Sequence, residues 1–298
     1  MTLSDKRNCV DPEAEISINN QCLILHLSKG SLYYKARPKH SFEDLKILQR
    51  MREVYSAYPI YGYRKLYAQL KRERFVTGRD RVLKYMRILG IQSICVKGKK
   101  KTSIPNKDHK KYPYLLNDLN IDRPNQVWAV DITYIRLKGG FVYFVAIIDW
   151  YSKYILSYRV SNSLEVSFCK EALSEAIERY GSPEILNSDQ GSQFTSYDFT
   201  NMLLDNKISI SMDSKGRAID NRIIERFFRS LKYENVYIYE YDTVKDVKSG
   251  IREYIQFYNT ERLHQTLKYK TPAEVYFTQM PSHSVRVGEQ MEKYRVLN

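Results

Sequence analysis

Three acidic residues, Asp131, Asp189 and Glu225, stand where local sequence patterns could bring carboxylates together. Asp131 lies inside VWAVDITYI, whose alternation predicts a β-strand that is apolar on both faces. An unpaired charge buried in such a strand costs several kcal/mol. Asp131 therefore needs either hydrogen bonds from the backbone, as an ordinary core aspartate has, or a bound cation.

The other two acids favour the cation. Asp189 ends the predicted strand PEILNSD, just before the polar loop QGSQF, and Glu225 lies on the predicted helix AIDNRIIERFFRSLKYENV. If the three met at one end of a sheet, each pair about 4 Å apart would repel by about 4 kcal/mol at an effective dielectric near 20. Oxygen ligands with no His or Cys nearby select Mg²⁺ or Mn²⁺ over zinc. The acids therefore predict a divalent-metal site.

The elements that must position these acids follow in a regular order. Strands are predicted at 127–135, 141–149, 154–160, 183–189 and 208–212, and helices at 164–180, 195–206, 220–237 and 243–258. Three antiparallel strands followed by an α-β-α-β-α series is the order of a ribonuclease-H-like α/β fold. We expect a mixed five-stranded sheet with helices on both faces and the strand of Asp131 at its centre.

The chain before this fold is basic. The net charge is +14, and residues 1–121 hold 25 Lys and Arg against 11 Asp and Glu, whereas residues 122–298 hold 23 of each. This asymmetry predicts a region that binds a polyanion, with nucleic acid the first candidate, joined to a neutral region with another task. The alternative is a basic surface that serves only solubility.

A helix-turn-helix-like pattern lies within the basic part. YGYRKLYAQLKRE predicts one helix, RFVTG a break and RDRVLKYMRILGI a second helix, and residues 14–38 give a weaker helical pair. The apolar face of the second helix holds Val82, Tyr85, Met86 and Leu89. Its basic residues fall largely outside that face: Arg79, Arg81, Lys84 and Arg87. Such a helix can enter a DNA groove, or it can be the solvated face of a small helical bundle.

The segment KGKKKTSIPNKDHKKYP reads as a linker in which Lys99, Lys100 and Lys101 contact phosphates or act only as a tether. Five segments are expected: a helical N-terminal segment 1–38, a helix-turn-helix-like region 39–95, a basic linker 96–124, a catalytic core 125–277 and a tail 278–298.

Several other classes of protein are disfavoured. The four cysteines are scattered without a CxxC pair, and the five histidines form no cluster with metal-ligand spacing. The start of the chain has no apolar signal region, and the apolar run FVYFVAII is too short to span a bilayer. We expect a cytoplasmic protein with no membrane partner.

The three acids have 57 and then 35 residues between them, and the second interval matches the D-35-E spacing of DDE transposases and retroviral integrases. The matching stretches are NQVWAVDITYI, NSDQGSQFTS, SKGRAIDNRIIERFFRSLK and YNTERLHQTLKYKTPAE, with YGYRKL before them. Over roughly residues 14–276 the chain resembles the catalytic, second-frame transposase of bacterial insertion sequences that carry two overlapping reading frames.

That resemblance implies a metal-dependent polynucleotidyl transferase that cuts element DNA ends and joins them to a target. Asp131 would bridge two Mg²⁺ or Mn²⁺ ions, and Asp189 and Glu225 would complete one site each. Lys232 would contact a DNA phosphate, although an ordinary solvated helix lysine is the alternative. Asn221 shares its polar stripe as a DNA contact, and Arg262 in the YNTERLHQTL segment would hold DNA or structure.

The implied partners are double-stranded DNA, further copies of this chain on that DNA, and the upstream-frame protein, in a bacterial cytoplasm with nucleoid association when DNA is bound. Two alternatives to a transposase stay open at this point. One is a ribonuclease-H-like nuclease that cleaves without joining, and the other is a non-catalytic DNA-binding regulator.

Overall fold

The computed structural model describes residues 1–34, 41–94, 112–213 and 221–279. The chain forms two compact units, Met1–Arg50 and Met51–Asn298. The first unit holds the short helices Leu3–Asn8 (α1), Ile18–Ile24 (α2) and Lys29–Leu32 (α3), together with the start of Phe42–Ala57 (α4). Helices α2 and α3 are the helical pair predicted within 14–38, in shorter form.

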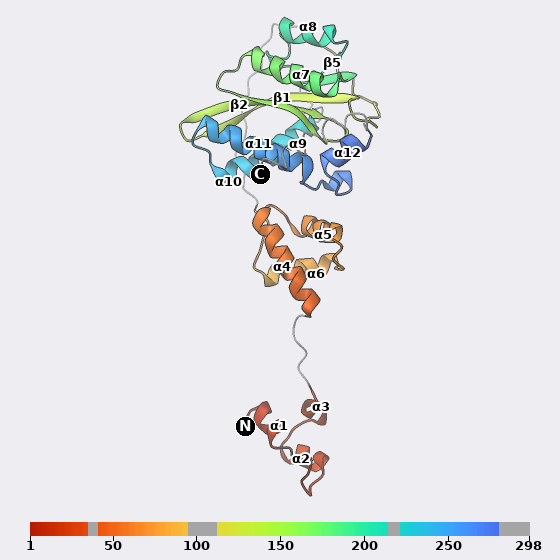
Figure 1. Cartoon of the computed structure of the whole chain (residues 1–298), viewed down its shortest axis with the longest axis vertical. Coiled ribbons are helices and arrows are strands. Elements are labelled where there is room, and N and C mark those ends of the chain that lie inside the picture. Colours follow the sequence, from red (N-terminus) through yellow and green to blue (C-terminus); the bar gives the residue numbers. More distant parts are fainter. Residues whose placement is uncertain (35–40, 95–111, 214–220, 280–298) are drawn as a thin grey trace. The chain divides into compact units, whose positions relative to one another are not determined.

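The second unit is built around a mixed five-stranded sheet (Figure 1). Its strands are Val127–Leu137 (β1), Gly140–Asp149 (β2), Ile155–Ser161 (β3), Ile185–Ser188 (β4) and Ser209–Met212 (β5). The order is β3-β2-β1-β4-β5, antiparallel from β1 to β3 and parallel from β1 to β5. The predicted sheet is confirmed, with the strand of Asp131 at its centre.

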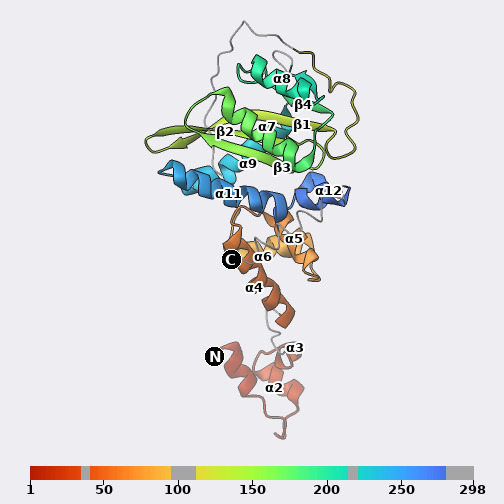
Figure 2. The ribbon, with the colours of Figure 1, turned by 45° about the horizontal axis from the view of Figure 1, so that its top comes forward.

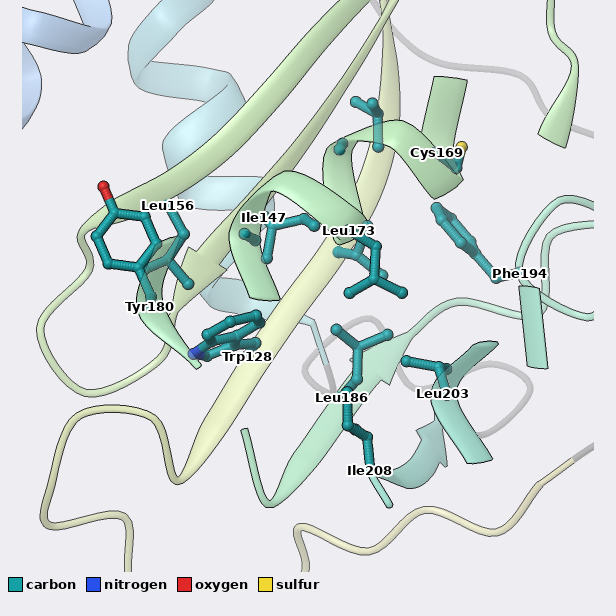
Figure 3. Close-up of a cluster of buried hydrophobic side chains, with 14 of the residues drawn as sticks. Trp128, Ile147, Leu156, Cys169, Leu173, Tyr180, Leu186, Phe194, Leu203 and Ile208 are labelled. Atoms are coloured by element: carbon teal, nitrogen blue, oxygen red, sulfur yellow. The ribbon is translucent and has the colours of Figure 1, made fainter. Parts of the chain in front are cut away.

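One face of the sheet is covered by Val166–Tyr180 (α7) and Tyr197–Asp205 (α8), and Ala273 and Tyr276 of Pro272–Thr278 (α12) join the same buried cluster. Successive residues of a strand point to opposite faces, and on β1 the even-numbered Trp128 and Val130 belong to this side. Figure 3 shows Trp128 and Ile147 of the sheet beside Leu173 of α7 and Leu203 of α8. This cluster closes the face opposite to the one toward which the alternation of β1 directs Asp131.

The opposite face is covered by Arg222–Leu231 (α9) and Val244–Thr260 (α11) (Figure 2). Here the odd-numbered Ala129 and Ile135 of β1 pack with Ile224, Phe227 and Leu231 of α9. Asp131 is odd-numbered as well, so the alternation of β1 directs it toward the side of α9. The apolar arc of α9 therefore holds this helix beside the strand that carries Asp131.

The end of α9 differs from the prediction. The expected helix over 220–237 ends as an α-helix at Leu231, continues as a π-helix over Lys232–Val236, and closes with the short helix Tyr237–Tyr239 (α10). π-Helical turns are rare and occur mostly inside α-helices, often at functional sites. Residue 220 lies outside the described residues.

The helix-turn-helix-like pattern is present as Tyr63–Arg72 (α5) and Arg79–Ile88 (α6), after α4. The apolar face of α6 is confirmed, with Val82, Tyr85 and Met86 buried and Leu89 half-buried. Residues 95–111 of the expected linker lie outside the described residues. Its later part packs on the core, since Leu116 is buried and the Leu115 N–H donates to the Ser211 hydroxyl of β5 at 3.0 Å.

A buried asparagine ties α11 to the edge strand β3. The side-chain Oδ1 of Asn259 accepts from the Ile155 N–H at 2.9 Å, and the side-chain NH₂ group donates to the Ile155 carbonyl at 3.0 Å. Asn259→Ala should therefore lower the free energy of unfolding by about 2–4 kcal/mol, because two buried backbone groups lose their partners. Urea unfolding of the full chain measures this loss.

The matched control is Gln256→Ala, on the exposed side of the same helix. It should stay within about 0.5 kcal/mol of wild type. Equal losses in the two variants would show that Asn259 contributes no more than an exposed helix residue.

Candidate active site

The pairing of β1 with β4 brings two of the predicted acids to neighbouring positions. In this parallel register Val127 pairs with Ile185 and Ala129 with Asn187, an offset of 58 residues. The last pair is Ala129 with Asn187, and Asp131 and Asp189 each follow it by two residues. Because paired strands lie about 4.8 Å apart, we expect the two aspartates near the same end of this strand pair.

Asp189 follows β4 at the start of a tight loop. Its Oδ1 accepts from the Gly191 N–H at 2.9 Å, and a Cβ added at Gly191 would lie 2.8 Å from that oxygen. Glycine is therefore needed for the backbone to approach the carboxylate so closely. Although Asp189 reaches the surface, the protein atoms around its carboxylate raise its pKa above the ordinary value.

Helix α9 runs beside β1 and is attached to it at two points. The Asn221 NH₂ group donates to the Val130 carbonyl at 3.4 Å, and the Lys232 ammonium donates to the Thr133 hydroxyl at 2.7 Å. Glu225 follows the first contact by four residues and precedes the second by seven, so its backbone lies between them along the helix. Its side chain is exposed. Two members of the predicted polar stripe, Asn221 and Lys232, thus contact the strand of Asp131, and the approach of Glu225 to Asp131 stays a prediction.

The described residues contain no group of three or more His, Cys, Asp or Glu side chains placed to hold a metal ion. Convergence of Asp131, Asp189 and Glu225 on a metal therefore stays a prediction. The donor chemistry does fit a hard cation, because all three acids supply oxygen. Asn221 adds a buried Oδ1 that has no hydrogen-bond partner among the described residues, beside the strand that carries Asp131.

Asp149 shows what a core aspartate looks like in this fold. It is fully buried, and it accepts hydrogen bonds from the N–H groups of Asn125 and Ser152 and from the Ser152 hydroxyl. Burial raises its pKa to about 6 despite those bonds. Asp131 is only half-buried, and its Oδ1 accepts from the N–H of Ile132. Asp149 is therefore an ordinary core aspartate, whereas Asp131 stays partly open to solvent.

One predicted DNA contact needs correction. Arg262 is 9% exposed, and its guanidinium binds both carboxylate oxygens of Glu234, at 2.6 and 2.5 Å. A buried guanidinium paired in this way holds the protein together and does not present itself to a phosphate. Its neighbour His264 is also buried, with Arg262 Nη1 3.2 Å from His264 Nε2. Of the two roles considered for Arg262, DNA binding and a structural role, these contacts support the structural role.

The basic residues predicted to contact DNA from the part of the chain before the core fall into two groups. Arg79, Arg81, Lys84 and Arg87 of α6 are exposed, as an outward basic face requires. Arg81 donates to the Tyr85 hydroxyl at 2.8 Å, and Arg79 lies over the Tyr67 ring. Lys99, Lys100 and Lys101 lie outside the described residues. DNA contacts by these residues remain predictions.

Comparisons with known proteins agree with this architecture. Models of an integrase core domain match residues 121–218 and 206–272, and a model of an HTH-like domain matches residues 43–100. The transposase of insertion sequence element IS904 from Lactococcus lactis is 30% identical over 218 residues, which span 72% of this chain and 86% of that protein. The chain belongs to the insertion-sequence transposases.

Other relatives extend the match. The InsK protein of element IS150 from Escherichia coli K12 is 30% identical over 83% of this chain and 89% of its own length, and the IS629 transposase of Shigella sonnei is 29% identical over 85% and 89%. The HTLV-2 integrase catalytic core domain, solved in complex with magnesium, aligns at 19% identity and a TM-score of 0.43, over 52% of this chain and 97% of that chain.

Family membership supports a DNA transposase role and places the chain among polynucleotidyl transferases. The HTH-like and integrase domains indicate DNA binding. Within the described part of the transposase, no helix is long and apolar enough to cross a membrane.

The sequence did not predict the contacts of two residues near the end of α9. Thr133, which holds Lys232, is two residues after Asp131 and so shares its face of β1, a spacing that could have identified it. Glu234 carried no comparable signal, because its partner Arg262 lies 28 residues away. Only the folded chain brings those two together.

The burial of His264 predicts that the stability of the transposase depends on pH. Burial, with the positive charge of Arg262, lowers its pKa from 6.5 to about 2. Below pH 6.5 the unfolded chain therefore binds a proton at His264 that the folded chain does not. Stability should fall as the pH falls, by about 1.4 kcal/mol per pH unit from this residue.

Unfolding free energies measured between pH 4.5 and 6.5 test this. The slope should be smaller by that amount in His264→Gln than in wild type. Identical slopes in the two proteins would mean that His264 titrates normally.

Proposed function

We propose that the chain is a DDE transposase that frees the 3′ ends of its element and joins them to target DNA. In the first step water attacks a phosphodiester at the element end, the bond to the 3′ oxygen breaks, and a 3′-hydroxyl and a 5′-phosphate result. In the second step that hydroxyl attacks a target phosphodiester and displaces a target 3′ oxygen. The observation that supports the proposal is the pairing of β1 with β4, whose last pair precedes both Asp131 and Asp189 by two residues, in a chain of the transposase family.

Asp131, Asp189 and Glu225 would hold the divalent ions, with two Mg²⁺ or Mn²⁺ expected and Asp131 shared between them. Bound there, such ions would activate the attacking oxygen and stabilise negative charge on the phosphate. The fit rests on oxygen donors alone and on the buried Asn221 Oδ1, whose side chain contacts the strand that carries Asp131.

The protein's own task is to position DNA. Thr133 directs the Lys232 ammonium along the strand that carries Asp131, where its charge would hold a phosphate beside the acids. Asn221 fixes the start of α9 on the same strand. The exposed basic face of α6 would bind the element ends. Two ends must meet in one complex, so copies of this chain, and the upstream-frame protein, are the proposed partners.

A strand-transfer assay on candidate element ends with Mg²⁺ separates the possible functions. Joined products support a transposase. Cleavage without joining favours a ribonuclease-H-like nuclease, and a mobility shift without any chemistry favours a DNA-binding regulator.

Replacing the acids should remove chemistry and leave DNA binding. Asp131→Asn and Glu225→Gln keep side-chain volume but lose a charged ligand, so the rate should fall by at least about a thousandfold at any Mg²⁺ concentration. Affinity for element ends, measured by fluorescence anisotropy, should stay within about threefold of wild type.

Glu178→Gln, an exposed glutamate on α7, makes the same chemical change elsewhere and should keep full activity. Full joining by Asp131→Asn would remove Asp131 from the reaction.

Lys232→Ala should act differently from loss of an acid. Losing one phosphate contact should reduce the slope of log affinity against log salt by about one unit, and it should lower the joining rate only in part. The control is Lys248→Ala on the exposed side of α11. If the two variants have the same salt slope and full activity, Lys232 is an ordinary surface lysine.

A further inference from the structure

A cluster of buried charges lies beyond the end of α9, away from the predicted metal ligands. Glu234 of the π-helix receives two hydrogen bonds from Arg262 and a third from the Tyr254 hydroxyl at 2.8 Å. The Lys65 ammonium of α5 lies 3.9 Å from Glu234 Oε1, with a side chain only 21% exposed. The cluster therefore joins the helix-turn-helix-like region, the end of α9 and the segment after α11.

The charges in this cluster depend on one another. Burial disfavours the ionised carboxylate, but the hydrogen bonds and charge of Arg262 outweigh burial and hold the pKa of Glu234 below its ordinary value. Burial, with the charge of Arg262, lowers the pKa of Lys65 to about 8. A buried charge that loses its partner is strongly destabilised. The ionised form of each member therefore depends on the charges of the other members.

Further contacts fix the position of α5 on the same side of the core. The Tyr58 ring stacks on Phe257 of α11 with ring centroids 4.8 Å apart. Arg72 binds both carboxylate oxygens of Glu274, at 2.7 and 3.1 Å. Lys65 therefore reaches Glu234 from a helix whose place is set by several contacts.

Glu234 is only two residues beyond Lys232, and both belong to the π-helix. Lys232 is held by Thr133 of β1, whereas Glu234 is held by Arg262 and Lys65. The end of α9 is thus fixed from two sides, by the central strand and by the helix-turn-helix-like region. A shift of α5 would move the second attachment.

We propose that Lys65 is a positioning residue: through Glu234 it holds the end of α9 against β1, so that the helix-turn-helix-like region helps to assemble the active site. The catalytic part of this inference rests on the proposed function of Glu225 and Lys232. A buried ion pair that supports only the general stability of the fold is the competing explanation.

Hydrogen exchange of the full-length protein tests the positioning directly. Lys65→Met removes the charge and retains most of the side-chain volume, and it should speed amide exchange across residues 222–236 by about tenfold, as expected for a lost coupling of moderate strength. Exchange in β1 and β2 should not change. Arg64→Met, the same loss of charge at the exposed neighbouring residue, should leave residues 222–236 as in wild type, and Lys65→Arg should restore protection.

If Lys65→Met exchanges faster throughout the chain, Lys65→Gln, which retains a hydrogen-bond donor, serves for the same comparison. The proposal is overturned if, in both variants, the exchange rate of residues 222–236 increases no more than the exchange rate of β1 and β2.

Activity gives a second readout. Lys65→Met should lower the maximal joining rate by about tenfold at unchanged affinity for element ends, and Lys65→Arg should recover the rate. A loss of affinity at an unchanged maximal rate would instead make Lys65 a DNA contact and overturn the proposal. If wild type joins no DNA, the proposed function fails, while the exchange measurement still decides whether Lys65 positions α9.

Discussion

The candidate site depends above all on the parallel pairing of β1 with β4. Its register offsets the two strands by 58 residues, so Asp131 and Asp189 each follow the last pair, Ala129 with Asn187, by two residues although 57 residues separate the two acids in the chain. Slippage by one residue would turn the side chains of one strand to the other face and separate the acids. The packed clusters on both faces of the sheet keep this register, because any slip would expose residues such as Trp128 that are fully buried.

Local patterns were sufficient for most of the fold. The pattern of β1 and the helical period of α6 predicted most of the buried residues, although Tyr134 of β1 is exposed. Each signal is carried by residues that are close together in the chain. They could not predict the π-helix after Leu231 or the pairing of Arg262 with Glu234. Those features depend on contacts between segments far apart in the chain. The sequence therefore left a DNA contact and a structural role open for Arg262, whose partner is the buried carboxylate of Glu234.

The division into a basic DNA-binding part and a neutral catalytic part also needs refinement. Not all positive charge before the core is free of acidic partners: Lys65 lies beside Glu234, and Arg72, although exposed, binds Glu274. The cations of α6 are exposed as well. The excess charge of the first 121 residues therefore has two uses, and the cations paired with acids of the core should add least to the salt dependence of DNA binding.

The spacing of Lys232 and Glu234 explains how one helix end can meet partners on opposite sides. Residues two apart in a helix project about 200° from one another, so a Lys232 that points to β1 leaves Glu234 pointing away from the sheet. That direction leads to Tyr254 of α11 and to Arg262 beyond it. A wider π-turn changes this angle only modestly, because it adds less than one residue per turn. Two neighbouring charges of opposite sign thus fasten the same helix to the strand that carries Asp131 and to the helices outside the sheet.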